Sequence, residues 1–201
     1  AVQNACQKHG ALLIMDEIPT GLGKTGKMFA FDHDHIEPDI VVLGKALGGG
    51  MLPLASVIAR KDLDVASDFA IGHYTHEKNP VTARAALTTL DIIEDEGLVD
   101  RAATHGTHAK ARLKDALHAH SYVGDIRGRG LMFGVEIVTD RNSRTPDPDR
   151  AERIYYACLD QGLSFKIGAS NVLTLSPPLV ISKEDLDTAL TIVIDAIRAT
   201  K

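Results

Sequence analysis

Short apolar runs without regular polar alternation mark the first third of the chain. Residues 11–15 and 40–43 are continuous apolar segments, and we interpret 54–59 as a third segment of the same kind. Runs of this length are typical of strands that are buried on both faces of a parallel sheet. The residues that follow such strands lie at the carboxyl edge of the sheet, where ligands bind in open α/β folds.

The middle of the chain changes to the period of an α-helix. Asn79 before Pro80 is a helix start signal, because Asn caps free N–H groups and Pro fits the first helical position. Apolar residues recur at helical spacing over 83–90, and again over 98–117. We therefore expect two consecutive helices here, of which the second is the longer.

The pattern changes again at about residue 120. Beyond this point, Val123 to Arg129 lead into an apolar segment. Residues 131–138 predict a strand, and the polar, proline-containing segment 139–149 predicts a loop. A helix over 150–161 and two short strands, near 163–166 and 172–175, complete this part.

The last helix has a clear beginning. Ser182 and Asp185 have the form of a capping box, and the helix that follows has a predicted buried stripe formed by Leu186, Leu190, Val193 and Ile197. The whole pattern predicts a larger α/β portion, residues 1–120, followed by a small α+β domain, residues 121–201.

Composition narrows the possible functions. A hydrophobic fraction of 44% and a charged fraction of 24% are those of a folded globular protein. The net charge of -5, without any basic run, argues against nucleic-acid binding. No apolar run approaches the ~20 residues needed to span a bilayer. Cys6 and Cys158 are isolated, which favours a reducing compartment. We expect a cytoplasmic protein whose partners are small molecules or a second subunit.

Two charged residues directly follow predicted strands. Asp16 follows the first strand, and Lys45 follows the second and precedes Gly48–Gly50. Each residue alone has an ordinary explanation, since an acid can cap a loop and a lysine can end a strand in solvent. A nucleotide-binding loop does not explain Lys45, because in the Walker motif the lysine follows the glycines.

The combination is far more specific than its parts. Segments 12–31 and 37–55, which contain Asp16 and Lys45 at a separation of 29 residues, resemble the signature of class III aminotransferases. Thr75, Asn79 and Pro80 resemble the Thr-x-x-x-Asn-Pro element of that family. Further matches to its C-terminal domain are found at 127–136 and 176–179.

This resemblance implies a fold and a cofactor. The fold is the C-terminal part of the large domain of a fold type I enzyme that depends on pyridoxal 5'-phosphate (PLP), followed by its small domain. Lys45 would form the Schiff base with PLP and then move the proton between Cα and C4′. Asp16 would pair with the pyridine nitrogen. Thr75 would bind the cofactor phosphate from the neighbouring subunit of a homodimer, and His73 has an equally good explanation as a structural residue.

Other parts of the family's site are expected upstream of Ala1. These are a glycine-rich loop for the phosphate and an aromatic residue that stacks on the ring. The chain starts within a predicted helix, so we interpret it as a piece of a longer polypeptide. We expect this piece alone neither to bind PLP tightly nor to turn over substrate.

Two positions depart from the family pattern. Pro19 stands where Gln is common, which removes an expected contact to the ring hydroxyl of the cofactor. Thr174 stands where relatives that use amino acids often have Arg, the natural clamp for a carboxylate. The substrate would then lack an α-carboxylate or be held by other groups; Lys166, Arg84 and Lys78 are candidates, although each is also explained as a solvated surface charge.

The resemblance favours transfer of an amino group between an amine or amino acid and a 2-oxo acid. The same family includes ammonia- and phospho-lyases that act on phosphorylated or phosphonate amines, epimerases and a decarboxylase, and Thr174 leaves these reactions open. A third alternative is a non-catalytic remnant that serves as an interaction module. The presence of Asp16, Lys45 and Thr75 argues against that alternative.

Overall fold

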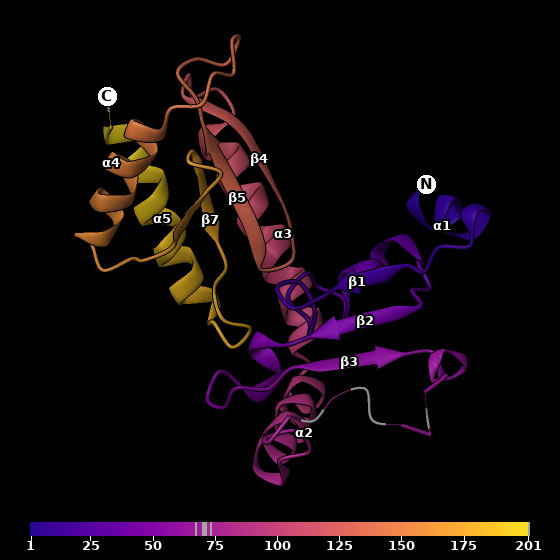
Figure 1. Ribbon diagram of the computed structural model, residues 1–201. Coiled ribbons are helices and arrows are strands. Elements are labelled where there is room, and N and C mark those ends of the chain that lie inside the picture. The colour runs from indigo at the N-terminus through magenta and orange to yellow at the C-terminus, as the bar shows by residue number, and fades with distance from the viewer. Residues whose placement is uncertain (67, 70–71, 73, 201) are drawn as a thin grey trace. The chain divides into compact units, whose positions relative to one another are not determined.

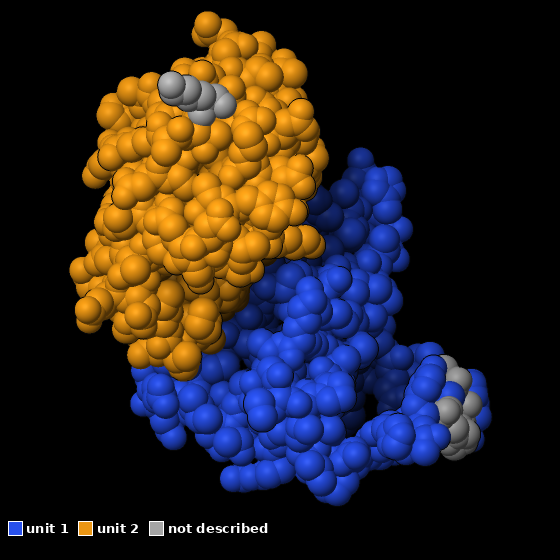
Figure 2. Space-filling view, turned by 90° about the vertical axis from the view of Figure 1, so that its left-hand side faces the viewer, with its two compact units in different colours: residues 1–23, 27–98 blue, residues 24–26, 99–201 orange. Residues whose placement is uncertain are grey.

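The computed structural model describes residues 1–66, 68–69, 72 and 74–200 (Figure 1). The chain divides into two compact units, which Figure 2 colours separately. Unit 1 comprises residues 1–23 and 27–98, and unit 2 comprises residues 24–26 and 99–201. Among the described residues, no helix is long and apolar enough to cross a membrane.

Unit 1 is built on a three-stranded sheet with the order β1-β2-β3. The strands are β1 (Ile14–Asp16), β2 (Ile40–Leu43) and β3 (Ser56–Ala59). β1 and β2 are parallel as expected, whereas β3 runs antiparallel to β2, which corrects the sequence interpretation. The connection from β2 to β3 holds only a short 3₁₀ turn, and a parallel pair needs a longer crossover, usually a helix.

The expected burial of these strands on both faces is also wrong. Val57 and Ile58 in β3 are 67% and 51% exposed, and Ile14 in β1 is 56% exposed. Leu43 is the buried residue of β2. Val57 and Ile58 are consecutive and point to opposite faces, so both faces of this sheet present apolar side chains to solvent.

The helices of unit 1 begin and end where local signals place them. α1 (Val2–His9) ends at Gly10, whose φ of 64° is the left-handed conformation of a helix cap. α2 (Pro80–Asp95) begins as predicted, since the Asn79 side chain accepts a hydrogen bond of 2.9 Å from Val81 N. The remaining elements are short 3₁₀ helices, η1 (Ala30–Asp34), η2 (Lys45–Gly48) and η3 (Lys61–Leu63).

Unit 2 contains a four-stranded antiparallel sheet with the order β4-β5-β7-β6. The strands are β4 (Val123–Arg129), β5 (Met132–Ile137), β6 (Lys166–Gly168) and β7 (Val172–Leu175). Alternate residues of β5, including Val135 and Ile137, lie on one face and are fully buried. Leu173 of β7 pairs with Val135 and extends this buried face.

Three helices share the core of unit 2 with that sheet face. They are α3 (Leu98–Leu117), α4 (Pro148–Leu159) and α5 (Lys183–Ala199). The predicted capping box of α5 is formed only in half: Ser182 Oγ caps the helix by accepting from Asp185 N at 3.0 Å, but the Asp185 carboxylate accepts from Ser182 Oγ at 2.7 Å instead of from the Ser182 backbone N–H. The predicted buried stripe of α5 is confirmed, because its four residues are almost fully buried: Leu186, Leu190, Val193 and Ile197.

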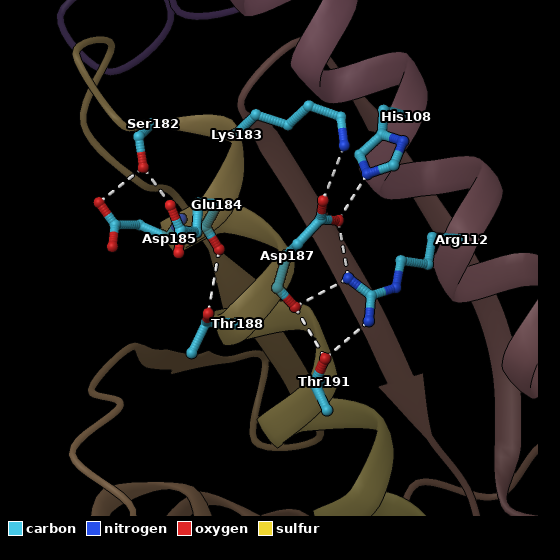
Figure 3. A network of polar contacts seen from close by, with 9 residues as sticks. All are labelled: His108, Arg112, Ser182, Lys183, Glu184, Asp185, Asp187, Thr188 and Thr191. Carbon is cyan, nitrogen blue, oxygen red and sulfur yellow. Dashed lines mark hydrogen bonds and ion pairs between the residues drawn. The ribbon is translucent and has the colours of Figure 1, made fainter.

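A polar network on the solvent side connects α3 to α5 (Figure 3). Asp187 Oδ1 contacts His108 Nε2 at 2.6 Å and accepts from Arg112 Nη1 at 2.7 Å, and Asp187 Oδ2 accepts from Lys183 Nζ at 2.9 Å. These contacts, the one with His108 above all, hold the pKa of Asp187 well below its ordinary value. The network fixes the register of the two helices above the apolar core.

The division by compactness falls at residue 98, earlier than the domain boundary predicted near residue 120. The reason is that Ala102, Ala109 and Leu113 on α3 are buried in the core of unit 2. Residues 24–26 also belong to that unit, where Lys24 O accepts from Leu131 N at 2.9 Å. The domain boundary near residue 120 stays a prediction.

Candidate functional site

Asp16 and Lys45 leave the same edge of the sheet in unit 1. β1 and β2 are parallel, and Asp16 pairs with Val42 across the ladder. Lys45 is three residues beyond Val42, just after the end of β2. The carboxylate and the amine therefore belong to adjacent carboxyl ends of parallel strands, the position predicted from the sequence.

The Asp16 side chain is exposed and only partly engaged. Its Oδ1 accepts one hydrogen bond of 3.1 Å, from Ile18 N. Its other oxygen has no partner among the described residues. A carboxylate with one oxygen held and the other open is suited to pair with a cationic group of a ligand.

Lys45 combines a free amine with an unfavourable backbone. Its side chain is exposed and has no hydrogen-bond or ion-pair partner in the described part of the chain. Its φ is 47°, in the left-handed region that costs a non-glycine residue roughly 1–2 kcal/mol. Other non-glycine residues, Lys78 among them, share a positive φ, so this strain alone does not identify a site.

The glycines after Lys45 have a structural reason. Gly49 has a φ of 69°, and a Cβ at this position would lie 2.9 Å from Thr89 Oγ1 on α2. The end of η2 therefore approaches α2 so closely that glycine is required. This packing holds the backbone that follows Lys45 against a regular helix.

Thr75 lies in the turn that precedes α2. Its side chain is exposed and makes no hydrogen bond to Asp16 or Lys45 in the structure as described. The predicted role of Thr75 in a neighbouring subunit's site stays a prediction. His73, which belongs to the same motif, lies outside the described residues.

The sequence interpretation assigned no role to Glu17, which directly follows Asp16. Glu17 is only 2% exposed, and its two carboxylate oxygens accept three hydrogen bonds, from Thr20 Oγ1, Ala30 N and Phe31 N. Two consecutive acids at a strand end were the available signal, because alternation directs such neighbours to opposite faces. Which one becomes buried depends on the loop that folds around it.

Position 174 lies in the sheet of unit 2. Thr174 in β7 pairs with Lys166 in β6 and with Gly134 in β5. The Lys166 side chain is exposed and has no polar partner within the described ranges. Lys78 and Arg84 in unit 1 are likewise exposed, as expected for solvated surface charges.

These features belong to a known class of enzymes. The model of the family "Aminotransferase class-III" matches residues 1–197, so the chain belongs to the class III aminotransferase family. The chain is 42% identical over 191 residues to (R)-1-hydroxy-2-aminoethylphosphonate ammonia-lyase of Vibrio splendidus (strain 12B01), a match that covers 95% of this chain and 40% of that protein. It is 41% identical over 201 residues to isoleucine 2-epimerase of Lentilactobacillus buchneri, covering 100% of this chain and 44% of the epimerase.

Solved structures agree with this assignment. A Bacillus anthracis aminotransferase superposes with a TM-score of 0.92 at 36% identity, over 98% of this chain and 47% of its own. Ornithine aminotransferase from Toxoplasma gondii, with partial occupancy of PLP at its active site, superposes with a TM-score of 0.89 at 32% identity, over 98% of this chain and 45% of its own. The chain thus spans less than half the length of these relatives.

The predicted family, fold class and cofactor are therefore confirmed, and PLP is the cofactor that the family implies. The residues of unit 1 fit this cofactor, because an open carboxylate suits a protonated ring nitrogen and a free primary amine suits an aldehyde. The relatives include an ammonia-lyase, an epimerase and ornithine aminotransferases. Family membership consequently defines the cofactor chemistry and leaves the reaction open.

Proposed function

We propose that this chain provides the lysine-bearing part of a PLP-dependent transaminase, which moves an amino group between an amine or amino acid and a 2-oxo acid. The observation that carries the proposal is the pair formed by the exposed Asp16 carboxylate and the free Lys45 amine at adjacent strand ends. The active form is a cytoplasmic homodimer with shared active sites.

Each residue has a defined task in this proposal. PLP, when bound, supplies an electron sink for the carbanion that forms at the substrate carbon. Lys45 holds the cofactor through its amine and, once released, carries a proton to and from the reacting carbon. Asp16 keeps the proton on the ring nitrogen by ion pairing. Thr75 donates its hydroxyl to the phosphate in the partner's site.

A lyase that acts on a phosphorylated or phosphonate amine is the second candidate. Thr174 in β7 is paired with Lys166 in β6. This position therefore offers the exposed ammonium group of a lysine, and it lacks the bidentate guanidinium of an arginine. Arg is preferred for a planar carboxylate, whereas Lys binds phosphate as a point charge. The Vibrio splendidus relative, whose name specifies a phosphonate amine, agrees with this alternative. Epimerase or decarboxylase activity is tested alongside it.

Covalent labelling tests the cofactor site. The complete gene product that carries this sequence is incubated with PLP and reduced with borohydride, and the modified peptide is mapped by mass spectrometry. We expect a pyridoxyl group on Lys45 and none in a Lys45→Ala variant. A label on another lysine, or none on the wild-type protein, would contradict the proposal.

Product analysis then separates the reactions. A transaminase needs a 2-oxo acid acceptor for multiple turnovers, whereas a lyase releases ammonia without one. An epimerase inverts the configuration at one carbon of the substrate, and a decarboxylase releases carbon dioxide. Neither reaction needs an acceptor. Turnover that is independent of any acceptor would contradict the transaminase proposal.

The dimer can be tested by complementation. If Lys45 and Thr75 in one site come from different subunits, Lys45→Ala and Thr75→Val proteins regain activity when they are unfolded and refolded together, because mixed dimers contain one intact site. Either variant refolded alone is the control. Mixed dimers without activity would contradict a shared site.

Residues 1–201 expressed alone form a separate case. We propose that they neither bind PLP tightly nor turn over substrate, because Asp16 and Lys45 would hold the ring nitrogen and the aldehyde, whereas the described residues of unit 1 place no cluster of donors beside them for the phosphate. Titration with PLP should give no stable absorbance that borohydride can fix. A stable, reducible complex would refute this part of the proposal.

A further inference from the structure

Asp16 and Glu17 are neighbours with opposite surroundings. Asp16 is exposed, whereas Glu17 is 2% exposed. Successive side chains of an extended segment point to opposite sides, so one acid faces the open edge and the other faces the interior. A buried carboxylate is costly unless its oxygens accept hydrogen bonds, which makes the partners of Glu17 informative.

The Glu17 side chain fastens both ends of the loop that follows β1. Its Oε2 accepts from Thr20 Oγ1 at 2.6 Å and from Ala30 N at 3.0 Å. Its Oε1 accepts from Phe31 N at 3.0 Å. One carboxylate therefore joins the first turn of the loop to the start of η1, more than ten residues further along the chain.

The Glu17 backbone adds a connection to β2 and closes the first turn. Its N–H donates to Val42 O at 2.9 Å, and its carbonyl accepts from Gly21 N at 2.9 Å. A Cβ at Gly21 would lie 2.9 Å from that carbonyl oxygen, so the turn closes tightly only with glycine there. Both the side chain and the backbone of Glu17 thus define the path of residues 18–21.

This turn contains the group that orients Asp16. Ile18 N donates to Asp16 Oδ1 at 3.1 Å, and this is the contact the described structure gives to that carboxylate. Ile18 lies between Glu17 and Thr20, inside the turn that the Glu17 carbonyl and carboxylate close. The direction of the Ile18 N–H is therefore set by the contacts of Glu17.

We infer that Glu17 is a positioning residue for Asp16, because its buried carboxylate fixes the turn whose Ile18 N–H aims the Asp16 carboxylate at the ring nitrogen of the cofactor. This inference rests on the proposed function, since it requires Asp16 to pair with that nitrogen. Glu17 acts without contacting the cofactor. Its loss should misdirect the charge of Asp16 rather than remove it.

The test replaces Glu17 by Gln in the complete gene product loaded with PLP. The Glu17→Gln side chain keeps its size but directs an N–H₂ group at donors, so the loop contacts cannot all form. We expect kcat to fall by about tenfold to a hundredfold, as for a misplacement near 1 Å, while KM for the amine stays nearly unchanged. The pH midpoint of the absorbance change of the bound cofactor should move upward. A ring nitrogen that holds its proton less firmly withdraws less electron density from the Lys45 nitrogen, and the Lys45 nitrogen then keeps its own proton up to a higher pH.

Asp32→Asn is the matched control. Asp32 Oδ2 accepts from Phe29 N at 3.0 Å in the same loop, with no contact to Ile18 or the first turn. Asp32→Asn should leave both kcat and the absorbance midpoint close to those of the wild type. An equal loss in both variants would mean that general loosening of the loop is the cause, and it would overturn the inference.

Two further variants make every outcome decisive. Asp16→Asn tests the premise: if it leaves kcat and the midpoint unchanged, the proposed role of Asp16 fails, and the inference fails with it. If Asp16→Asn abolishes turnover while Glu17→Gln behaves like the wild type, only the inference fails. If Glu17→Gln does not fold, Thr20→Val replaces it, since this change removes one donor to Glu17. A smaller drop in kcat together with an upward shift of the absorbance midpoint supports the inference. Unchanged kcat and an unchanged midpoint overturn it.

Discussion

The two sheets of the chain bury their apolar side chains to very different degrees. In unit 2, Val135 and Ile137 on β5 and Leu113 on α3 are fully buried. In unit 1, Val57 and Ile58 on β3 remain more than half exposed. Each unit has one sheet and at least one long helix, so the difference lies in how many layers of chain cover the apolar residues.

The less covered unit is the one that carries the candidate chemistry. Asp16 and Lys45 stand at the edge of the unit 1 sheet, whereas the Asp187 network of unit 2 connects two helices. Contiguous exposed apolar residues usually mark surfaces that bind other polypeptide. We therefore expect the unit 1 sheet to pack against further polypeptide in the active enzyme, and unit 2 to be stable through its own core.

The largest expected effect separates chemistry from stability at Lys45. Lys45→Gly removes the amine and should lower activity by about 100- to 10,000-fold, since a proton-transfer group is lost. The same change relieves the left-handed conformation at φ 47° and should stabilise the fold slightly, by up to about 1 kcal/mol. Turnover assays and thermal unfolding of the same samples measure both quantities.

Lys78→Gly is the control for Lys45→Gly. Lys78 is also an exposed lysine of unit 1 with a positive φ, 57°, so its stability change should match that of Lys45→Gly while activity is retained. A Lys45→Gly protein that still turns over substrate would refute the assigned role. Loss of activity in Lys78→Gly would instead identify Lys78 as an anion contact.

Local signals in the sequence predicted much of this fold. The bounds of β2 and β7 agree with the apolar runs, and Asn79 and Ser182 cap α2 and α5 as expected. The capping atoms lie within three residues of the helix start, β2 is apolar along its whole length, and β7 is apolar except for Thr174. Such features depend on neighbouring residues alone, which is why a sequence reveals them.

Features that depend on distant partners were harder to predict. β6 lies at Lys166–Gly168 instead of 163–166, because its pairing with β7 decides which residues form the ladder. The direction of β3 and the burial of Glu17 likewise depend on chain that folds back from elsewhere. For the candidate site, Asp16 and Lys45 followed from their motif, whereas the support of Asp16 by Glu17 required the structure. The start of α4 at Pro148, capped by Asp147, was a local signal that the proline-rich loop interpretation overlooked.

A pair of leucine substitutions sharpens the contrast in burial. Leu113→Ala in α3 removes a fully buried side chain and should destabilise unit 2 by about 2–5 kcal/mol. Leu87→Ala in α2 removes a side chain that is 54% exposed and should cost less than about 1 kcal/mol in residues 1–201 alone. Denaturant unfolding of both variants gives the two free energies.

The same pair tests whether unit 1 is covered in the active enzyme. If further polypeptide packs on α2, Leu87→Ala becomes markedly more costly in the complete, PLP-loaded gene product than in residues 1–201. Leu113→Ala should cost the same in both, because its surroundings are already closed. An unchanged cost of Leu87→Ala would show that this face of α2 stays in solvent.

The smallest expected effect concerns acid stability in unit 2. The pKa of Asp187 is lowered by its contacts with His108, Lys183 and Arg112, so its contribution to stability is fully present above the ordinary carboxyl pKa and is lost as the pH falls from there through the lowered pKa of the folded protein. Asp187→Asn should therefore destabilise the protein at pH 7 by less than about 1 kcal/mol, because the pairs are partly solvated, and by a smaller amount at pH 3, where the contribution has begun to fall but is not yet lost. Asp195→Asn, an exposed change on the same helix, should be neutral at both pH values. Thermal unfolding at the two pH values measures the difference, and an Asp187→Asn effect that does not decrease between pH 7 and pH 3 would show that the network stabilises α3 and α5 through shape rather than charge.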